Sequence, residues 1–381
     1  MTADPPVWPG DHDAVRSLWA LDPSVAYVNH GAFGAAPRPV LEEQARLRAL
    51  LEADPFDFLY RRYESRLREA RVAVAALLNA DPDGLAFVPN ASTGVATVVR
   101  ALGIGPGDRV VVTDHAYQAV LIALRAVGAD VVVVALDLAA PDLAGPVLDA
   151  VDERTRLVVV DAIASATAVR MPFEALVAGC RARGVPCVVD AAHAPGHLPV
   201  DLRALDPDWW TGNLHKWCCT PRGAAVLWTR AAWRDRTHPL VPSHGYGQGY
   251  AREFDWVGTH DPTAWLVAPA AIALLASLGP ALPAYCRDLA AWGAALTGLP
   301  RPVDPARHER MVLLDAGLAS GAEAEALRDA LWHDDRVEVG GMVWRGRGWV
   351  RVSTAVYNRP QDYERLARSL RAHGRVGAWD E

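Results

Sequence analysis

The stretch RLVVVDA at residues 156–162 decides the fold, because its apolar residues are continuous instead of alternating with polar ones. Further runs of this kind are LAFV (85–88), RVVVTD (109–114), DVVVVAL (130–136), VPCVVD (185–190) and GAAVLW (223–228). Helical patterns such as YQAVLIALRAVG (117–128) lie between them. Strands with continuous apolar runs are buried on both faces and alternate with crossover helices in parallel sheets. The sequence therefore predicts an α/β fold, with a mainly parallel sheet sandwiched by helices.

Helical spacing with charged outer faces also marks residues 39–52 and 63–79. After about residue 260 the valine runs stop, and helical segments surround RMVLLDA (310–316), RVEV (336–339) and GWVRVS (348–353). This change predicts a smaller α+β domain at the C-terminal end. We expect an N-terminal segment at residues 1–25 that packs with the small domain, a large domain at 26–258 and the small domain at 259–381.

Charge and composition exclude several classes of partner. The formal net charge of the 381 residues is −7, and acids alternate with arginines without the basic stripe that binds a phosphate backbone, so no nucleic-acid partner is expected. The first residues lack the basic and apolar regions of a signal peptide, which predicts a cytoplasmic protein. Residues 263–286 carry no charge but contain three prolines, which favours a buried or interface helix pair over a membrane span.

Neither metal nor disulfide chemistry is expected. His193 and His197 are four residues apart, yet a proline and a glycine between them prevent the regular helix that would align two ligands. The number of cysteines is odd, without a metal-ligand spacing, and predicts reduced and mostly buried thiols. They are Cys180, Cys187, Cys218, Cys219 and Cys286.

Lys216, in TGNLHKWCCT (211–220), is the only lysine among 38 basic residues. A guanidinium keeps its proton in proteins, whereas a buried ammonium can lose it, and the free amine can attack a carbonyl carbon. Lys216 is therefore a candidate for imine chemistry. The alternative is a solvated surface lysine left by chance in an arginine-rich protein.

Polar residues follow several of the apolar runs. In open α/β sheets, ligands bind at the carboxyl ends of the strands. This rule selects Asn90–Thr93, Asp114 with His115, Asp190 and Lys216, which we expect to converge on one crevice. The segment GIGPGD (103–108) does not indicate a dinucleotide-binding site. It precedes its strand instead of following it, and is predicted to be a turn.

Pyridoxal 5′-phosphate (PLP) fits these residues better. This cofactor needs an amine, a carboxylate for its ring nitrogen, a flat group over the ring and a cradle for its phosphate. Lys216 and Asp190 supply the first two, His115 can stack, and NASTG (90–94) opens a helix whose N–H groups can face an anion. Taken singly, each has another interpretation: Asp190 as a turn acid, Ser92 or Thr93 as a helix cap, and His115 as a loop hydrogen-bonding group.

Together these segments resemble the class V aminotransferase group of fold-type I PLP enzymes, and most of all isopenicillin N epimerase-like proteins. The matching segments occur in the family's order over residues 27–358, nearly the whole chain. They are YVNHGAFGAAPRPVLE (27–42), FVPNASTGV (87–95), VVTDHAY (111–117), VVDAAHAPGHLPVDL (188–202), TGNLHKW (211–217), VGTHDPTAW (257–265) and VRVSTAVYN (350–358).

The resemblance implies roles for the residues of the cofactor site. Lys216 would bind PLP covalently and move protons at the substrate Cα, and Asp190 would pair with the pyridine nitrogen. His193 would lie near the ring hydroxyl, and His115 would stack on the ring, with Tyr117 as the alternative. The phosphate would be held by residues of two segments, which are Ala91, Ser92, Thr93 and His215.

The resemblance also implies a homodimer and a substrate site. Gly258 and Thr259 would reach the phosphate from the neighbouring subunit, so that the two active sites would be shared. Arg351 would clamp the α-carboxylate of an amino acid through its planar fork. Asn29 and His30 would line the pocket.

Two departures limit what the family can imply about the reaction. Where relatives carry an Asn or His, this chain has Ala162, so a polar contact to cofactor or substrate is expected to be missing. Cysteine desulfurases of this class carry a nucleophilic cysteine shortly before the carboxylate arginine, but residues 330–350 contain none. Persulfide formation is therefore disfavoured.

The favoured reaction is carbon–sulfur β-lysis of an S-substituted cysteine, which needs only the lysine and a leaving group. Epimerisation is the first alternative and needs a second acid–base group opposite Lys216. Transamination is another, and a catalytically silent PLP-fold binding protein is the alternative from a different class. Entrance or surface positions are expected for Arg61, Arg62, Tyr246 and Tyr250.

Overall fold

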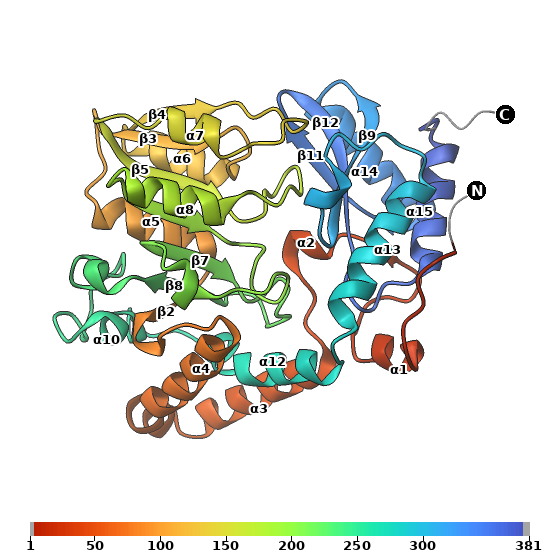
Figure 1. Cartoon of the computed structure of the whole chain (residues 1–381). Helices are drawn as coiled ribbons and strands as arrows, with labels where there is room; N and C mark the ends of the chain where they lie inside the picture. The colour runs from red at the N-terminus through yellow and green to blue at the C-terminus, as the bar shows by residue number, and fades with distance from the viewer. Residues whose placement is uncertain (1–3, 376–381) are drawn as a thin grey trace.

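The computed structural model describes residues 4–375, which form a large part around one sheet and a smaller part beside it (Figure 1). Seven strands of the large sheet lie in the order β2-β8-β7-β6-β5-β3-β4. They are β2 (Leu85–Val88), β3 (Arg109–Thr113), β4 (Asp130–Val134), β5 (Thr155–Asp161), β6 (Cys187–Asp190), β7 (Trp209–Asn213) and β8 (Ala225–Thr229).

The mainly parallel sheet is confirmed. Strands β4, β3, β5, β6 and β7 pair in parallel, while β8 runs antiparallel to both of its neighbours, β7 and β2. Successive valines of β3 point to opposite faces, so Val111 joins one hydrophobic cluster and its neighbours Val110 and Val112 join another. This burial on both sides explains the continuous apolar runs of the inner strands. For β4, at the edge of the sheet, the expected burial is wrong, because its residues are exposed or half-buried.

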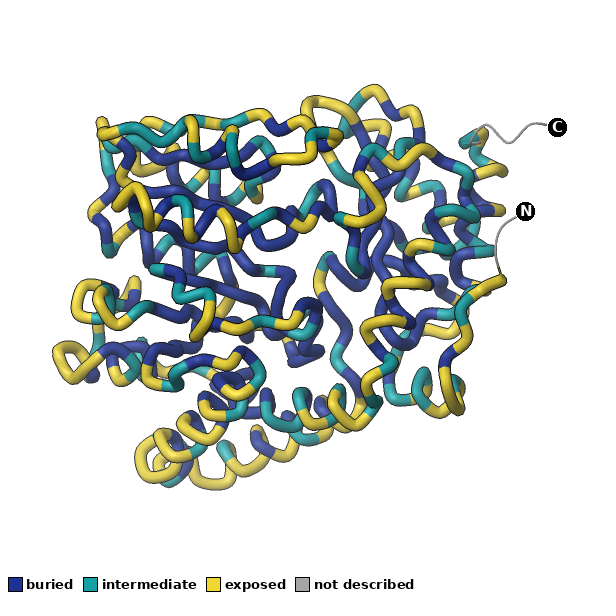
Figure 2. Tube along the Cα trace, viewed as in Figure 1, coloured by how far each residue is buried: buried dark blue, intermediate teal, exposed yellow. Residues whose placement is uncertain are grey.

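Helices cover both faces of the sheet, whose strands are mostly buried in Figure 2. One face packs against α5 (Ala91–Ala101), α6 (Gln118–Ala126) and α10 (Tyr250–Asp255). The other packs against α4 (Tyr63–Leu77), α8 (Phe173–Ala182) and α12 (Ala268–Ser277). The remaining helical elements of this part are α3 (Arg38–Ala53), η1 (Asp57–Arg62), η2 (Pro82–Gly84), α7 (Gly145–Asp149), α9 (Leu202–Leu205), η3 (Ala231–Arg236) and α11 (Thr263–Leu266).

The smaller part holds a three-stranded antiparallel sheet in the order β11-β12-β9. Strand β1 (Ala26–Tyr27), just after the N-terminal segment, pairs in parallel with β10, and Trp8 and Trp19 of that segment join the hydrophobic cluster of this part. Its elements are α1 (His12–Ser17), β1 (Ala26–Tyr27), α2 (His30–Phe33), α13 (Leu282–Leu296), η4 (Pro305–Arg307), β9 (Met311–Leu318), α14 (Gly321–Asp335), β10 (Val337–Glu338), β11 (Gly340–Trp344), β12 (Arg347–Ser353) and α15 (Pro360–Ala372). The division at residue 258 stays a prediction.

The uncharged segment forms α11, α12 and the first turns of α13. Among the described helices, none is long and apolar enough by itself to cross a membrane; the pair Thr263–Ser277 and Leu282–Leu296 passes the same test by length and composition, with a bend of 75° between its members. Ala268 and Ala271 of α12 are buried against the large core, and α12 contacts α3 and α4.

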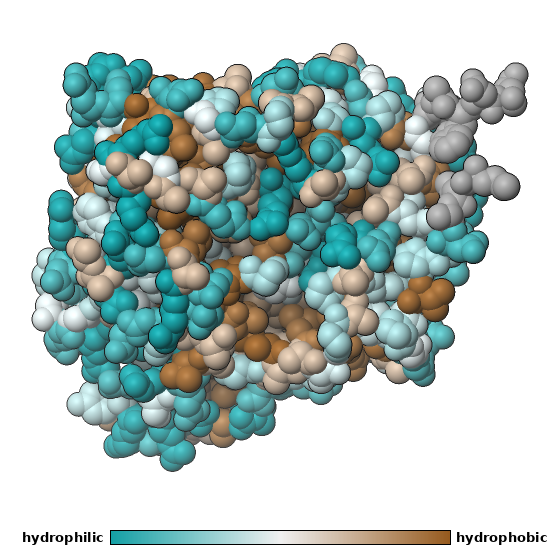
Figure 3. All heavy atoms as spheres, in the orientation of Figure 1, coloured by the Kyte–Doolittle hydropathy of each residue, from teal (hydrophilic) through white to brown (hydrophobic). Residues whose placement is uncertain are grey.

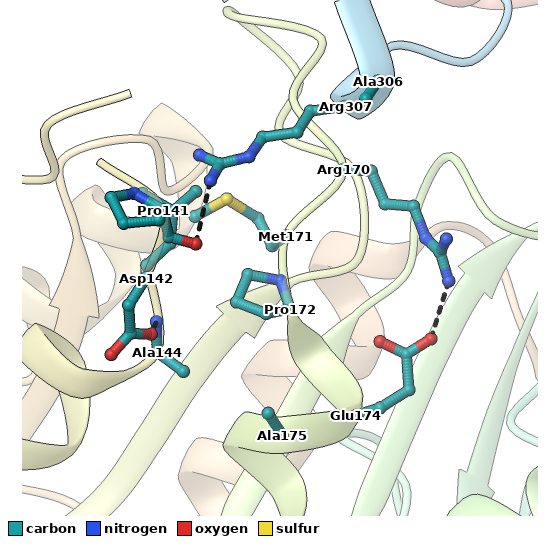
Figure 4. A pocket seen from close by; sticks show the side chains of 11 residues that line it. Pro141, Asp142, Ala144, Arg170, Met171, Pro172, Glu174, Ala175, Ala306 and Arg307 are labelled. Atoms are coloured by element: carbon teal, nitrogen blue, oxygen red, sulfur yellow. Dashed lines mark hydrogen bonds and ion pairs between the residues drawn. The ribbon is translucent and has the colours of Figure 1, made fainter. Parts of the chain in front are cut away.

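Arginines join the two parts. Arg307 of η4 donates to the backbone carbonyl oxygens of Leu138, Ala140 and Pro141 at 3.2, 2.6 and 3.1 Å. Figure 4 shows Arg307 reaching across to Pro141. The nearby ion pair between Arg170 and Glu174 lies within the large part. Hydrophobic side chains also gather near the middle of the face drawn in Figure 3, between the large sheet and the smaller part. The smaller part is thereby held beside the carboxyl ends of the strands.

Candidate active site

The carboxyl ends of β2, β5, β6 and β7 surround a cavity of about 280 Å³. Eight of the residues named from the sequence line it, and they come from four separate segments. They are Asn90, Ala91, Ser92, Tyr117, Asp190, His193, His215 and Lys216. The predicted convergence of these segments is thus seen in the structure.

Lys216 lies in the connection between β7 and β8, where it is half-buried and lines the cavity. Burial, with the charge of Arg351 adding to it and that of Asp190 opposing it, lowers the pKa of Lys216 to about 7. A substantial fraction of the amine is therefore unprotonated near neutral pH. The interpretation of Lys216 as a solvated surface residue is wrong.

The hydrogen bonds around Lys216 also favour the free amine. The Trp217 indole N–H donates to His193 Nδ1 at 3.3 Å, and burial lowers the pKa of His193 well below 6.5. A neutral imidazole with an accepting Nδ1 carries its proton on Nε2. His193 Nε2 lies 3.0 Å from Lys216 Nζ and so donates to it. Only an unprotonated amine can accept this bond.

Two buried carboxyl groups lie beside one another at the ends of β5 and β6. Asp161 and Asp190 are register partners, and both line the cavity. Asp190 Oδ1 accepts the backbone N–H of Ala192 at 3.1 Å, and among the described residues no cation pairs with either carboxyl group. Asp161 was not selected from the sequence, although it closes its apolar run as Asp190 closes the neighbouring one.

The N-terminus of α5 points toward the cavity. Its cap is Asn90, whose side-chain oxygen accepts the Thr93 N–H at 2.9 Å, so the interpretation of Ser92 or Thr93 as the cap is wrong. Ser92 therefore keeps its hydroxyl available to a ligand. Asn213 Oδ1 accepts the Ala91 N–H at 2.9 Å and joins this turn to the end of β7.

His215 lies close to this turn and is neutral. Its Nδ1 lies 2.9 Å from the carbonyl oxygen of Ala224, which can only accept a proton, and burial lowers the pKa of His215 to about 4. The other ring nitrogen, Nε2, is then free of its proton. An anion bound beside it would stabilise the imidazolium and raise this pKa.

Arg351 of β12 is a buried cation that forms no ion pair with any acidic side chain among the described residues. It is 2% exposed, and burial lowers its pKa to about 10. Its Nη1 donates to the backbone oxygen of Ser165, a cavity residue, and its Nε has no partner among the described residues. A buried guanidinium that lacks an acid can bind a ligand carboxylate.

Asn29 and His30 are not among the residues that line this cavity, contrary to expectation. His30 is buried behind Lys216, with Nε2 at 3.0 Å from the Lys216 backbone oxygen and Nδ1 at 2.9 Å from the Tyr357 hydroxyl. The Asn29 amide donates to Glu338 at 3.4 Å. Both residues hold the lysine loop and the N-terminal segment in place instead of facing the cavity.

Tyr117, and not His115, lines the cavity. His115 is buried beneath the hairpin of the smaller part, where its ring stacks on Trp344 with centroids 4.9 Å apart. Its Nδ1 lies 2.8 Å from the Thr167 hydroxyl. The geometry favours Tyr117, named as the alternative, as the flat group over a ligand ring.

Other expected site residues lie elsewhere. Ala162 is packed in the core, and the neighbouring Ile163 and Ser165 face the cavity, so this segment does offer polar groups through Asp161 and Ser165. Tyr250 is buried against the sheet and is not an entrance residue. Thr259 is exposed in a bend beside Gly258, outside the cavity of this subunit.

The cysteines are free and buried, as expected. Burial raises the pKa of the Cys218 thiol, and it raises that of Cys219 to about 12. Both stay protonated at neutral pH and are poor nucleophiles.

The sequence profile of the family described as aminotransferase class-V matches residues 57–280. The chain belongs to the aminotransferase class-V family. An L-cysteine desulfhydrase of Arabidopsis thaliana is 31% identical to this class-V protein over 399 aligned residues, which cover 91% of this chain and 87% of the relative. The isopenicillin N epimerase of Amycolatopsis lactamdurans is 31% identical over 391 residues, covering 93% and 97%.

Solved structures share the fold. A mutant of the protein C-DES, with glycine covalently linked to its PLP cofactor, matches this class-V protein with a TM-score of 0.79. The match covers 91% of this chain and 96% of that one at 20% sequence identity. The fold-type I architecture expected from the sequence is confirmed.

Proposed function

We propose that this class-V protein is a PLP-dependent carbon–sulfur β-lyase that acts on an S-substituted cysteine. The observation that carries the proposal is the Lys216 amine, which accepts a hydrogen bond from His193 in a cavity that also holds Asp190 and adjoins Arg351. Bound PLP acts as an electron sink for the pair of electrons left at the substrate Cα.

The cavity residues fit this cofactor. Lys216 offers the amine for its aldehyde, and Asp190, which lacks a cationic partner among the described residues, would pair with the ring nitrogen. The α5 N-terminus with Ser92, together with His215, would hold the phosphate. Tyr117 would cover the ring.

Substrate binding and proton transfer follow from the remaining groups. Arg351 would bind the α-carboxylate and orient Cα toward Lys216. With a pKa near 7, the Lys216 amine can accept the Cα proton and later return it. The Cβ–S bond then breaks with its electron pair on sulfur, and the thiolate takes up a proton and leaves as the thiol. Hydrolysis of the remaining three-carbon fragment gives pyruvate and ammonia.

Space and relatives support lysis of a substituted cysteine. Phe33 and Tyr117 line the cavity and are 68% and 47% exposed, so an apolar substituent can extend past them toward solvent. The desulfhydrase name of the Arabidopsis relative is in line with cleavage at the same bond. A desulfurase is disfavoured, because residues 330–350 carry no cysteine and the two cysteines beside Lys216 are buried and protonated.

Epimerisation is the second candidate, because the Amycolatopsis relative of nearly equal identity carries that name. It uses the same Cα proton but needs a donor on the opposite side of the substrate. Transamination and a silent binding role remain the further alternatives.

We also propose a homodimer with shared sites. Gly258 is half-buried and Thr259 is exposed, so both are accessible to a second subunit. The family resemblance supports this role.

The test is incubation of the PLP-loaded protein with S-alkyl cysteines and with cysteine. Released thiol and pyruvate in equal amounts, abolished in Lys216→Ala, are the expected result. Exchange of the Cα proton for deuterium without cleavage would contradict the lyase and favour the epimerase. A keto acid that retains its sulfur substituent would indicate transamination.

A further inference from the structure

Asp161 and Asp190 occupy matching positions on neighbouring parallel strands. Paired residues of adjacent strands project from the same face of a sheet, so both carboxyl groups point to one side. Each residue is only 4% exposed, and each lines the Lys216 cavity. The sheet therefore forces two acids into the same small, poorly solvated space.

Two carboxylates in such a place cannot both be charged without a large cost. Like charges raise each other's pKa, and burial adds to the effect. The titratable residues lining the cavity around the pair are Lys216, His193, His215 and Tyr117, and neither histidine is charged. Among the described residues no ion pair neutralises a second anion there.

The surroundings distinguish the two acids. Asp190 accepts the backbone N–H of Ala192 at 3.1 Å, and this hydrogen bond stabilises its anion against the effect of burial on its pKa. For Asp161, burial and the charge of Asp190 together raise the pKa well above its usual range, with only its own backbone N–H acting in the opposite direction. These surroundings favour the proton on Asp161.

We propose that Asp161 is a positioning residue: it holds the one proton that the Asp161–Asp190 pair shares, and it leaves Asp190 as the single anion between them. The inference rests on the proposed function, in which Asp190 faces the ring nitrogen of the cofactor. A neutral Asp161 keeps the cavity from carrying a second negative charge, which would oppose entry of both the phosphate and the substrate carboxylate. Asp190 then remains the one partner for a pyridinium.

Infrared spectroscopy of the cofactor-free protein with isotope-labelled aspartate tests this inference directly. The wild type should show a protonated aspartic acid at about pH 8, where Asp255, with a pKa of about 6, is ionised. The Asp161→Asn variant should lose this band. The Asp190→Asn variant should keep it, with a titration midpoint at lower pH, because the neighbouring anion is gone.

A matched control is Asp288→Asn, whose side chain is exposed and whose loss should leave the band unchanged. Absence of the band from the wild type, or its persistence in Asp161→Asn, would overturn the proposal. An unmoved midpoint in Asp190→Asn would do the same, and this comparison needs no change at Asp161, so it holds even if Asp161→Asn fails to fold.

Cofactor binding separates this inference from the proposed function. At neutral pH, Asp161→Asn should bind PLP within about threefold of the wild type, because an amide is also neutral, while Asp190→Asn should bind it about tenfold or more weakly. An equal loss in both variants would contradict the assigned proton. Failure of the wild type to bind PLP would defeat the proposed function and leave the infrared result intact.

Discussion

The reactivity of Lys216 depends on its surroundings as well as on its being a lysine. The amine lines a cavity beside Arg351, accepts a hydrogen bond from His193 and has no counter-ion in contact among the described residues. The same residue on the surface would be an ammonium at neutral pH. An arginine in the same place would keep its charge and could not attack an aldehyde.

The low pKa of Lys216 predicts a pH-dependent cost to stability. Its pKa is about 7 in the folded protein and 10.5 in the absence of burial, so between these values the unfolded chain binds more protons. The free energy of unfolding that Lys216 contributes therefore rises as the pH increases from 7 toward 10.5. Lys216→Met lacks this term. The variant should therefore be more stable than the wild type near pH 7, and the difference between their free energies of unfolding should decrease as the pH rises.

Urea denaturation of both cofactor-free proteins at several pH values from about 7 to 9 measures this difference. All other titrating groups are common to the two chains and cancel. Parallel curves of stability against pH would show that the Lys216 pKa is not lowered.

Arg351 should carry much of the affinity for the amino-acid carboxylate. Arg351→Ala is expected to weaken binding of an amino-acid ligand by about 1.5–3 kcal/mol, the contribution of a charge-assisted hydrogen bond. Arg347→Ala is the matched control, since Arg347 lies on the same strand but is solvent-accessible and pairs with Asp315 at 3.1 Å. Spectroscopic titration of the PLP-loaded proteins would show the loss in the first variant alone; equal affinities would remove Arg351 from the carboxylate site.

The sequence predicted which residues converge but not every direction in which they point. Lys216, Asp190, His193 and Ser92 line the cavity, because strand ends determine their position. His115 was misplaced, because its stacking on Trp344 depends on a hairpin more than 200 residues away. Asp161 was missed, although its position at the end of an apolar run was the signal that selected Asp190.

Loop geometry places the lysine as firmly as the strands do. Gly34 has a φ of +69°, and a Cβ there would lie 2.1 Å from the backbone oxygen of His215. The N-terminal loop therefore packs directly on the segment that carries Lys216. Only glycine satisfies both the backbone conformation and the close approach.

Gly34→Ala should destabilise the protein by more than the roughly 1–3 kcal/mol of backbone strain alone, because φ +69° with ψ 168° is a conformation that only glycine adopts readily. Gly103→Ala is the control, because Gly103 also has a positive φ, of +62°, but a Cβ there would meet nothing within 4 Å. Denaturation midpoints and PLP uptake should fall more in Gly34→Ala. Equal effects in the two variants would show that the contact with His215 is unimportant.

The valine-rich strands, and also the segments RVEV and GWVRVS of the smaller part, were predictable from the sequence, whereas β11 was not. The valine runs became β3, β5 and β6, which are buried on both faces, and β4, an edge strand whose residues are exposed or half-buried despite the same pattern. Strand β7 is buried like β6, but its WWTGN sequence includes glycine and polar residues that pack under other elements. Strand β11 begins with two glycines and forms only because β12 lies beside it.

Residues from both parts of the molecule form the site, and the proposed partner subunit would add Gly258 and Thr259 to it. Arg351 comes from the smaller part and Lys216 from the larger one. The hydrogen bonds of Arg351 and Arg307 to backbone oxygens of the large part fix the relative position of the two parts. Gly258 and Thr259 lie outside the cavity of their own subunit. A shared site would explain why the family signature extends to them.

Mixing inactive subunits tests the shared site. In a heterodimer of Lys216→Ala and Thr259→Asp subunits, one of the two sites would be intact, so random exchange should restore about a quarter of the wild-type activity. A mixture of Lys216→Ala and Asp190→Ala subunits should restore none, because both residues act within one subunit. Equal recovery in the two mixtures, or none in either, would contradict a site built from two chains.

The covalent link between Lys216 and the cofactor is tested most directly by reduction of the PLP-loaded protein with borohydride, followed by peptide mass mapping. The account predicts a pyridoxyl group on the peptide that contains Lys216 and none in Lys216→Ala. An unlabelled Lys216, or a label at another site, would contradict it.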